Sequence, residues 1–421
     1  MAKIFSIGSG FDKDPGFYGK LGVPRSILSA DSKAARSMRS KSNAIVAPRD
    51  WGVMAEKAYL ATRNASDQLA SRFKKGEEID LFQMLRSIST DIICHLCFGF
   101  SPEFVNKPEE AKKLLDVLDM CLEGLWFTVH IPFLAEYLFS LPKWLLKILL
   151  PGLTYFRNQG GEWIDRNLDY SKNAHPNDRK TTVIEALNPS KDHNLSEADR
   201  EWLIDQGNTF VFAGVDTTST MLMYTFHKVL SSPDIHSRLK QELQDANLLI
   251  EDGYDWRQVR QLPYLTAVIK EGLRLSVVIP GRLPRTVPAE GIEYNGIFLP
   301  GGLRTDKGTK TTVSSTIYSM HHNPTIFPNP EKFDPGRWLA ENSIELERYN
   351  VAFSKGSRSC IGMNLAYLEI YTTMALFFSR FDMILEYPAP GKELEWADCL
   401  ARRSKDIIKV RITADKFFSY A

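Results

Sequence analysis

The chain has 421 residues, 43% of them hydrophobic and 24% charged, which is the composition of an ordinary globular protein. Its 52 Lys and Arg nearly balance its 51 Asp and Glu, so the charge indicates no nucleic-acid partner. The five cysteines are an odd number in a long chain, which argues against a disulfide framework and favours a reducing compartment.

The N-terminal segment contains no apolar stretch long enough for a signal peptide or a membrane span. The most apolar region is internal, at residues 125–153, and prolines and charged residues interrupt it. Trp144, with the leucines and lysines around it, allows two interpretations: this region lies on a membrane surface, or it packs inside the protein.

Most of the first two-thirds of the chain predicts helix, including the apolar segment 81–98. A long helix should begin at Ser196, where four residues form a capping-box pattern, and no proline follows until Pro233. Such a helix would span roughly 50 Å and cross the molecule. Pro233 and Pro263 each begin a further helix.

After Pro280 the chain alternates Gly, Pro and β-branched residues in short runs, which indicates strands and turns. The expected strands are 282–287, 292–299 and 310–317, followed by a helix at about 361–380 and a strand pair at 383–387 and 407–412. Because no repeat or linker divides the chain, we expect a single domain over residues 1–421, mainly α with small β-sheets (α+β).

The strongest motif surrounds Cys360, which directly precedes the last predicted helix. A cysteine in that position receives backbone N–H groups and the positive end of the helix dipole, which stabilise a thiolate. Gly356 permits a tight turn, Gly362 lets the helix approach a flat cofactor, and Phe353 can cover the sulfur. Arg358 can pair with a haem propionate. The plain alternative is an unreactive buried cysteine.

These five positions resemble the haem-binding loop of the cytochrome P-450 family. By average composition, the pattern would arise by chance in roughly one chain in ten thousand. The resemblance implies heme b (iron protoporphyrin IX) with Cys360 as its axial, metal-binding ligand, in the P-450 fold with the long helix over the haem.

Glu271 and Arg274, three residues apart, share a helix face. Alone the pair is ordinary, but the resemblance implies a buried structural triad with Arg337 that fixes the cysteine loop. Loss of one member of such a triad costs roughly 3–5 kcal/mol. Gly336 departs from the family, which often has Glu there.

Gly214, Asp216 and Thr217 are unusual in the apolar middle of the long helix. One interpretation is that Thr217 bonds back to the carbonyl of Ala213. The family resemblance implies instead that Thr217 opens a notch for oxygen over the iron and that Asp216 is its partner in proton delivery.

Arg285 and Arg39 resemble propionate-contacting positions, although either can be a solvated surface residue. Ala35 departs from the family, which has an aromatic residue or His nearby. His321 and its neighbour His322 are interpreted as structural and not as a metal pair.

Cys94-His95-Leu96-Cys97 invites a metal site. On a helix the two cysteines share one face, whereas His95 lies elsewhere, and no second ligand pair is evident. We therefore disfavour that interpretation.

The motifs follow the family order from about Phe11 and look most like fungal microsomal members that oxidise terpenoid, polyketide or alkaloid intermediates. The resemblance implies an oxidoreductase that uses O₂ and receives electrons from NADPH through a flavoprotein reductase on the cytosolic face of the endoplasmic reticulum. The membrane anchor and the first helix and strands of the family are not found, so a cytoplasmic location is the alternative. Residues 303–309 look like an insertion.

Two other functions stay open: a peroxide-driven or isomerase-type haem-thiolate enzyme, and a non-catalytic haem-binding protein. The segments expected to line the pocket, 124–137, 210–214 and 277–283, are apolar and predict a hydrophobic ligand.

Overall fold

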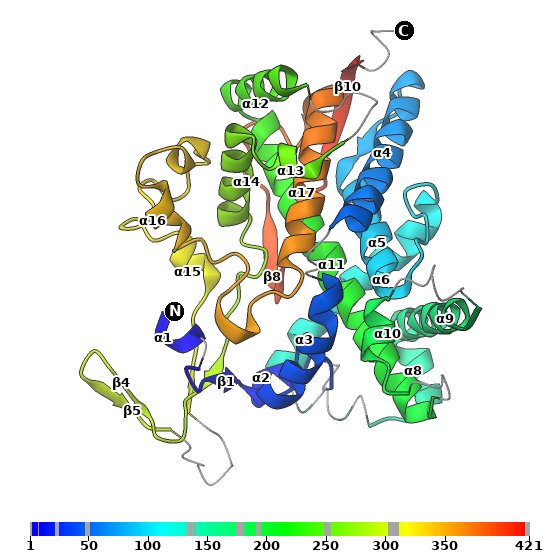
Figure 1. Cartoon of the computed structure of the whole chain (residues 1–421), viewed down its shortest axis with the longest axis vertical. Coiled ribbons are helices and arrows are strands. Elements are labelled where there is room, and N and C mark those ends of the chain that lie inside the picture. The colour runs from blue at the N-terminus through cyan, green and yellow to red at the C-terminus, as the bar shows by residue number, and fades with distance from the viewer. Residues whose placement is uncertain are drawn as a thin grey trace.

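The computed structural model of the chain describes residues 2–6, 8–21, 25–46, 51–131, 133, 137, 140–173, 181–190, 195–247, 254–301 and 311–416. Helices form most of the molecule, and the β4–β5 hairpin projects from one corner (Figure 1).

The longer helices are α3 (Ser32–Val46), α4 (Gly52–Lys74), α5 (Leu81–Phe98), α6 (Pro108–His130), α9 (Pro151–Asn173), α11 (Glu197–Leu230), α12 (Pro233–Ala246), α14 (Pro263–Ser276) and α17 (Met363–Arg380). The short ones are α1 (Ala2–Phe5), α2 (Pro15–Tyr18), α8 (Lys143–Leu149), α10 (Val183–Leu187), α13 (Trp256–Val259), α15 (Ile317–His321), α16 (Ser343–Glu347) and the 3-10 turns η1 (Pro335–Trp338) and η2 (Gly356–Arg358).

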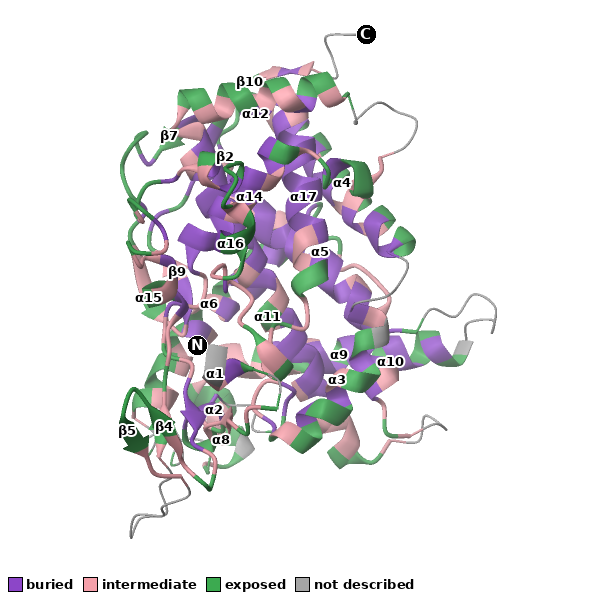
Figure 2. Ribbon diagram, turned by 60° about the vertical axis from the view of Figure 1, so that its left-hand side comes forward, coloured by how far each residue is buried: buried purple, intermediate pink, exposed green. Residues whose placement is uncertain are grey.

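The long helix forms where the sequence predicts it. Ser196 caps α11, with its hydroxyl accepting a hydrogen bond from the Asp199 N–H at 3.1 Å, and the helix runs for 34 residues. Helices α5, α9, α14 and α17 pack against it, and Figure 2 shows the buried core at the centre of this group. At Gly214 a Cβ would lie 2.8 Å from Ile93 Cγ1, so this glycine lets α11 approach α5 closely.

The described residues form four small sheets around the helices, with strand orders β1-β3-β6, β2-β10-β7, β4-β5 and β8-β9. Their strands are β1 (Asp12–Lys13), β2 (Ile79–Asp80), β3 (Arg285–Thr286), β4 (Ile292–Tyr294), β5 (Ile297–Leu299), β6 (Thr312–Val313), β7 (Phe381–Tyr387), β8 (Trp396–Cys399), β9 (Ala401–Ser404) and β10 (Lys409–Asp415). The predicted C-terminal strand pair forms, with Met383 opposite Ile412.

Several element boundaries differ from the prediction. The expected strands 282–287 and 310–317 shrink to two residues each within the described part of the chain, and α15 begins at Ile317. The hairpin β8–β9 was not predicted, and its turn residue Leu400 has a φ of 74°. Helix α17 begins at Met363, two residues later than expected, because Gly362 is its N-cap.

The apolar region 125–153 spans the end of α6, α8 and the start of α9, except that residues 132, 134–136, 138 and 139 lie outside the described part. Trp144 and Ile148 are 66% and 67% exposed, so for these side chains the interpretation of a packed interior segment is wrong. The expected insertion at 303–309 also lies outside the described residues. Among the helices that are described, none is long and apolar enough to cross a membrane.

Candidate active site

Two backbone hydrogen bonds and one glycine shape the loop before α17. The Cys360 N–H donates to the Phe353 carbonyl at 2.9 Å, and the Ser359 N–H donates to the Gly356 carbonyl at 3.1 Å. Gly356 has a φ of +78°, and a Cβ there would lie 1.6 Å from the Phe5 carbonyl oxygen, so no other residue fits this turn. The Phe353 ring packs 5.2 Å from that of Tyr367 and so fixes the start of the loop.

The Cys360 side chain is accessible at its surface, although protein atoms surround it closely enough to desolvate the thiol. The residue is exposed, yet burial among protein atoms raises the pKa of its thiol, while the Gly362 N–H and the charge on Arg39 lower it. Both observations fit a side chain that opens onto space enclosed by the protein. Met363, at the start of α17, is also 39% exposed, and a Cβ at Gly362 would meet no atom within 4 Å.

The buried middle of α11 contains a matching exposed strip. Ala213 is exposed and Thr217 half-buried, whereas Val211 and Val215 are completely buried. Spacing of four residues places Ala213 and Thr217 on one face of the helix. The Thr217 hydroxyl donates to the Ala213 carbonyl at 2.7 Å, as the plainer interpretation of this motif predicts.

Positive charge collects near Cys360. Burial lowers the pKa of Arg358, and Nη1 of that residue is buried without a hydrogen-bond partner among the described residues, its nearest carboxylate oxygen being Asp12 Oδ1 at 3.8 Å. The pKa of Lys13 lies well below its ordinary value because of burial and the charges on Arg358, Arg285 and Arg39. Among the described residues, Asp12 is the carboxylate that lies near Arg358, and the group formed by Lys13, Arg358, Arg285 and Arg39 would be stabilised by further negative charge from a ligand.

Aromatic rings hold Arg285 within this group of cations. Arg285 is 4% exposed, its Nη1 donates to the Tyr18 hydroxyl at 3.0 Å, and the guanidinium lies 4.6 Å from the Phe5 ring. Arg39 projects from α3, where Ala35 is fully buried. The structure therefore brings together Cys360, Arg358, Arg39 and Arg285.

Glu271, Arg274 and Arg337 form a hydrogen-bonded group. Arg274 Nη2 and Nε donate to the two Glu271 oxygens at 2.8 and 2.9 Å, and Arg337 Nε donates to Oε1 at 3.0 Å. Trp338 Nε1 and the Asp334 N–H add bonds of 2.8 and 3.0 Å to the same carboxylate. Gly336 does not prevent this arrangement.

Arg274 connects this group to the segment that follows α15. Its Nη1 donates to the carbonyls of His321 and Pro330, both at 2.8 Å. His321 itself bonds the Arg274 carbonyl through Nδ1 and accepts the Val351 N–H at Nε2. Burial lowers the pKa of His321 to about 3, so this histidine is neutral and structural.

Asp216 does not bond Thr217 in this arrangement. Its Oδ1 lies 2.7 Å from Arg86 Nη2 of α5, and the single hydroxyl proton of Thr217 goes to Ala213. Burial raises the pKa of Asp216, and Arg86 opposes that shift. The expected acid–alcohol pair is therefore adjacent in sequence, but the two side chains point to different partners.

Four residues that take part in the interactions of this site were not identified from the sequence: Lys13, Tyr18, Arg86 and Trp338. Trp338 follows Arg337 directly, so the motif that contains Arg337 also indicates it. The other three act through contacts between distant segments, such as the Tyr18–Arg285 bond across 267 residues.

The Cys94–Cys97 motif holds no metal ligand set. Both cysteines are buried, and burial raises both pKa values. Within the part of the chain that the structure describes, no group of three or more His, Cys, Asp or Glu side chains could hold a metal ion.

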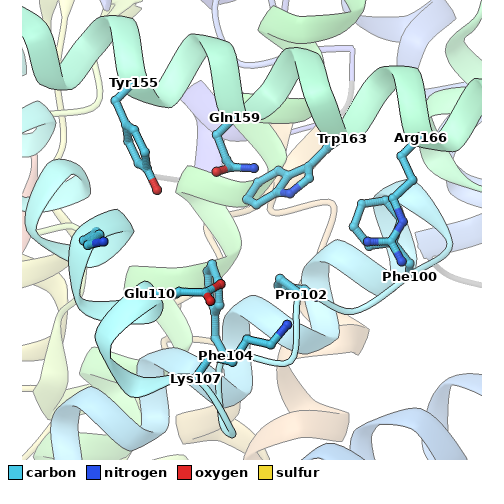
Figure 3. Close-up of a pocket in the computed structure, with 10 residues that line it drawn as sticks. Phe100, Pro102, Phe104, Lys107, Glu110, Tyr155, Gln159, Trp163 and Arg166 are labelled. Atoms are coloured by element: carbon cyan, nitrogen blue, oxygen red, sulfur yellow. The ribbon is translucent and has the colours of Figure 1, made fainter.

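A surface pocket of about 320 Å³ lies between α9 and the α5–α6 connection (Figure 3). Trp163 and Tyr155 of α9 face Phe104 and Glu110 across it. None of its lining residues comes from α3, α11 or the loop before Cys360, so it is separate from the candidate site.

The residues of the candidate site fit a haem. An exposed but enclosed thiol at a helix N-terminus can bind iron, an adjacent glycine leaves room for a flat ring, and cations in excess of carboxylates suit its two propionates. Arg358 is the clearest candidate for a propionate contact, because its buried Nη1 has no hydrogen-bond partner in the part of the chain that the structure describes.

Comparison with known proteins agrees with this geometry. Residues 6–410 match the family model for cytochrome P-450. The chain is 36% identical to cytochrome P-450 monooxygenase aneF of Aspergillus aculeatus, covering 98% of this chain and 83% of that protein. It is 33% identical to cytochrome P-450 monooxygenase penB of Penicillium thymicola, covering 98% and 92%. The solved structure of retinoic acid-bound cyanobacterial CYP120A1 shares the fold, with a TM-score of 0.73, 22% identity, and coverage of 98% and 87%.

Proposed function

This chain belongs to the cytochrome P-450 family and is a monooxygenase, and on that premise we propose that it oxidises a hydrophobic intermediate of fungal secondary metabolism. Family membership implies a haem, a small-molecule substrate, O₂ and a redox partner that supplies electrons. The observation that carries the proposal is the Cys360 thiol, which is exposed at the start of α17 and interacts with the charge on Arg39. Arg39 in turn belongs to a group of cations with Arg358, Arg285 and Lys13.

A bound haem would supply the redox chemistry by which one atom of O₂ enters the substrate and the other leaves as water, with two electrons from the redox partner and two protons. We assign the iron ligand to Cys360, whose negative charge the Gly362 N–H and Arg39 stabilise. Arg358, Arg39 and Arg285 would hold the propionates.

Glu271, Arg274 and Arg337 have a structural role in this proposal. Their hydrogen bonds tie α14 to η1 and to the segment that leads toward the cysteine loop. A loop held in this way presents the sulfur without reorganising when the cofactor binds.

Proton delivery is assigned to Asp216 and Thr217. Because the Thr217 hydroxyl donates its proton to the Ala213 carbonyl, its oxygen keeps its lone pairs free. That oxygen can therefore accept a hydrogen bond from a proton donor bound at the exposed strip of α11. Asp216 is the nearest buried acid along the helix, and it must move or use water to reach Thr217.

We further propose that electrons come from NADPH through a flavoprotein reductase at the cytosolic face of the endoplasmic reticulum. The exposed apolar side chains Phe133, Trp144 and Ile148, at 73%, 66% and 67% exposure, support contact with a membrane surface there.

The first test is the spectrum of the reduced, carbon-monoxide-bound protein. The wild type and a Cys399→Ala control should show the red-shifted band of a thiolate ligand, because Cys399 lies in β8, outside the loop. Cys360→Ala should lose it. An unchanged band in Cys360→Ala protein with stoichiometric haem contradicts the assignment.

The second test is turnover with NADPH and reductase. Thr217→Ala should form less product per NADPH consumed than wild type, whereas Thr218→Ala, a buried neighbour, should stay coupled. Turnover with peroxide alone would identify the peroxide-driven alternative, and haem binding without turnover would identify a haem-binding protein.

A further inference from the structure

Asp216 of α11 lies in a charged group that joins three helices. Its Oδ1 is 2.7 Å from Arg86 Nη2, and its Oδ2 is buried without a hydrogen-bond partner among the described residues. Arg86 is 4% exposed on α5. The same guanidinium donates to Asp119 of α6, from Nη2 to Oδ1 at 2.9 Å and from Nη1 to Oδ2 at 3.2 Å.

The three groups do not balance, because two carboxylates share one guanidinium. Burial raises the pKa of Asp216, Arg86 lowers it, and Asp119 raises it again. On the α6 side, burial and then the charge of Asp216 raise the pKa of Cys121 to about 11. The described ionisable groups that interact with Asp216 are thus Arg86 from α5 and Asp119 and Cys121 from α6.

The approach of α5 to α11 makes this arrangement possible. Gly214 lies two residues before Asp216, and a Cβ there would lie 2.8 Å from Ile93 Cγ1. Ile93 and Arg86 are seven residues apart on α5 and therefore share a helix face. The contact at Gly214 consequently sets the distance at which Arg86 meets Asp216.

Asp119 differs from Asp216 in its exposure. Its side chain is 31% exposed, compared with 8% for Asp216 and 5% for Arg86. Asp119 can therefore exchange Arg86 for water at little cost, whereas Asp216 cannot. Any displacement of α6 changes how much of the Arg86 charge acts on Asp216.

We propose that Arg86 and Asp119 are positioning residues for proton delivery: Arg86 holds the Asp216 carboxylate toward α5, and Asp119 sets how strongly it is held. This inference rests on the proposed function. It couples the position of α6, which lines the expected substrate region, to the acid on α11.

The test uses full-length haem-loaded protein and two readouts. Infrared difference spectra against pH give the titration midpoint of Asp216, assigned by the band that Asp216→Asn removes. Hydrogen peroxide released per NADPH consumed, measured with reductase and no added substrate, follows proton delivery. Asp119→Asn should lower the midpoint and Arg86→Gln should raise it, each by one pH unit or more, which is tenfold in proton affinity.

Two controls match these variants. Arg86→Lys keeps the charge and should stay near the wild-type midpoint. Asp116→Asn makes the same change on α6, at a residue that pairs with Lys112 on the surface, and should leave the midpoint unmoved. The pH profile of peroxide release should shift with the infrared midpoint in each variant.

Shifts of the same sign for Asp119→Asn and Arg86→Gln, or no shift, overturn the proposal. A shift in the infrared midpoint that the peroxide profile does not follow also overturns it. Both results are distinct from failure of the proposed function, in which the wild type itself lacks the thiolate spectrum. Because Asp119 is partly exposed, Asp119→Asn keeps the test decisive should Arg86→Gln fail to fold.

Discussion

At the scale of single residues, Glu369 has a buried carboxyl whose pKa is shifted far above its ordinary value. It lies on α17, is 3% exposed, and accepts a hydrogen bond from the Ser89 hydroxyl of α5. Burial raises the pKa of Glu369 to about 8, and Ser89 opposes that shift. The folded protein therefore holds this group as a neutral acid at pH 7.

This carboxyl makes stability depend on pH. A folded pKa of about 8 against the ordinary 4.5 means that its contribution is complete below pH 4.5 and is lost as the pH rises toward 8. Relative to Glu369→Gln, the free energy of unfolding of the wild type should fall by up to about 1.4 kcal/mol per pH unit in that window. Urea unfolding at pH 5.5 and 7.5 measures it. A constant difference between the two proteins would show that Glu369 ionises normally.

Two of the residues found from the sequence, Gly356 and Cys360, are required by the backbone at their own positions, whereas the arginines and Glu271 were found through the family resemblance. Gly356 needs a positive φ, and Cys360 needs a helix that begins directly after it. Both requirements are therefore visible in one short motif. Lys13 and Arg86 could not be found in that way, because each is defined by partners on other elements. Charge and burial become visible for them only after the chain folds.

At the scale of elements, the contact of α5 with α11 depends on one missing methyl group. Gly214→Ala should destabilise the protein by about 1–3 kcal/mol, because the new Cβ would lie 2.8 Å from Ile93 Cγ1. The double variant with Ile93→Ala should be more stable than the sum of the single changes. Urea unfolding of the four proteins measures this coupling.

Gly124→Ala is the matched control on α6. A Cβ there meets nothing within 4 Å, so the same change should stabilise the helix by up to about 1 kcal/mol. Equal effects at Gly214 and Gly124 would show that the close approach of α5 and α11 is relaxed in solution.

Helices were predictable where local signals coincide, whereas the two-residue strands β1 and β2 were not. The cap at Ser196 and the prolines at 233 and 263 determine three helix starts from neighbouring residues alone. Strands β1 and β2 have two residues each and exist because β3 and β10 pair with them across the molecule. A two-residue pattern carries no periodicity, so tertiary pairing decides it.

At the scale of the whole molecule, the cation group links cofactor binding to stability. Lys13 is desolvated beside three arginines, and this repulsion destabilises the haem-free protein. In the haem-bound protein the negative propionates would stabilise the same positive charge. Lys13→Met should therefore raise the stability of the haem-free protein. It should also speed haem transfer to an acceptor apoglobin about tenfold, equivalent to about 1.4 kcal/mol.

Lys33→Met is the control, because Lys33 is an exposed residue on α3. It should change neither haem transfer nor thermal unfolding of the haem-free protein. If Lys13→Met slows haem transfer, the cations do not hold the propionates.

The five hydrogen bonds to Glu271 have a consequence for the order in which the chain assembles during synthesis. Trp338 follows Glu271 by 67 residues, so a nascent chain that has just completed α14 offers the carboxylate only Arg274. If that pair were buried early, the Glu271 carboxylate would lack most of its hydrogen-bond donors. We therefore expect the Glu271 face of α14 to stay hydrated until η1 has been synthesised. This region should accordingly close only after η1 has been synthesised, shortly before the loop that carries Cys360 emerges from the ribosome.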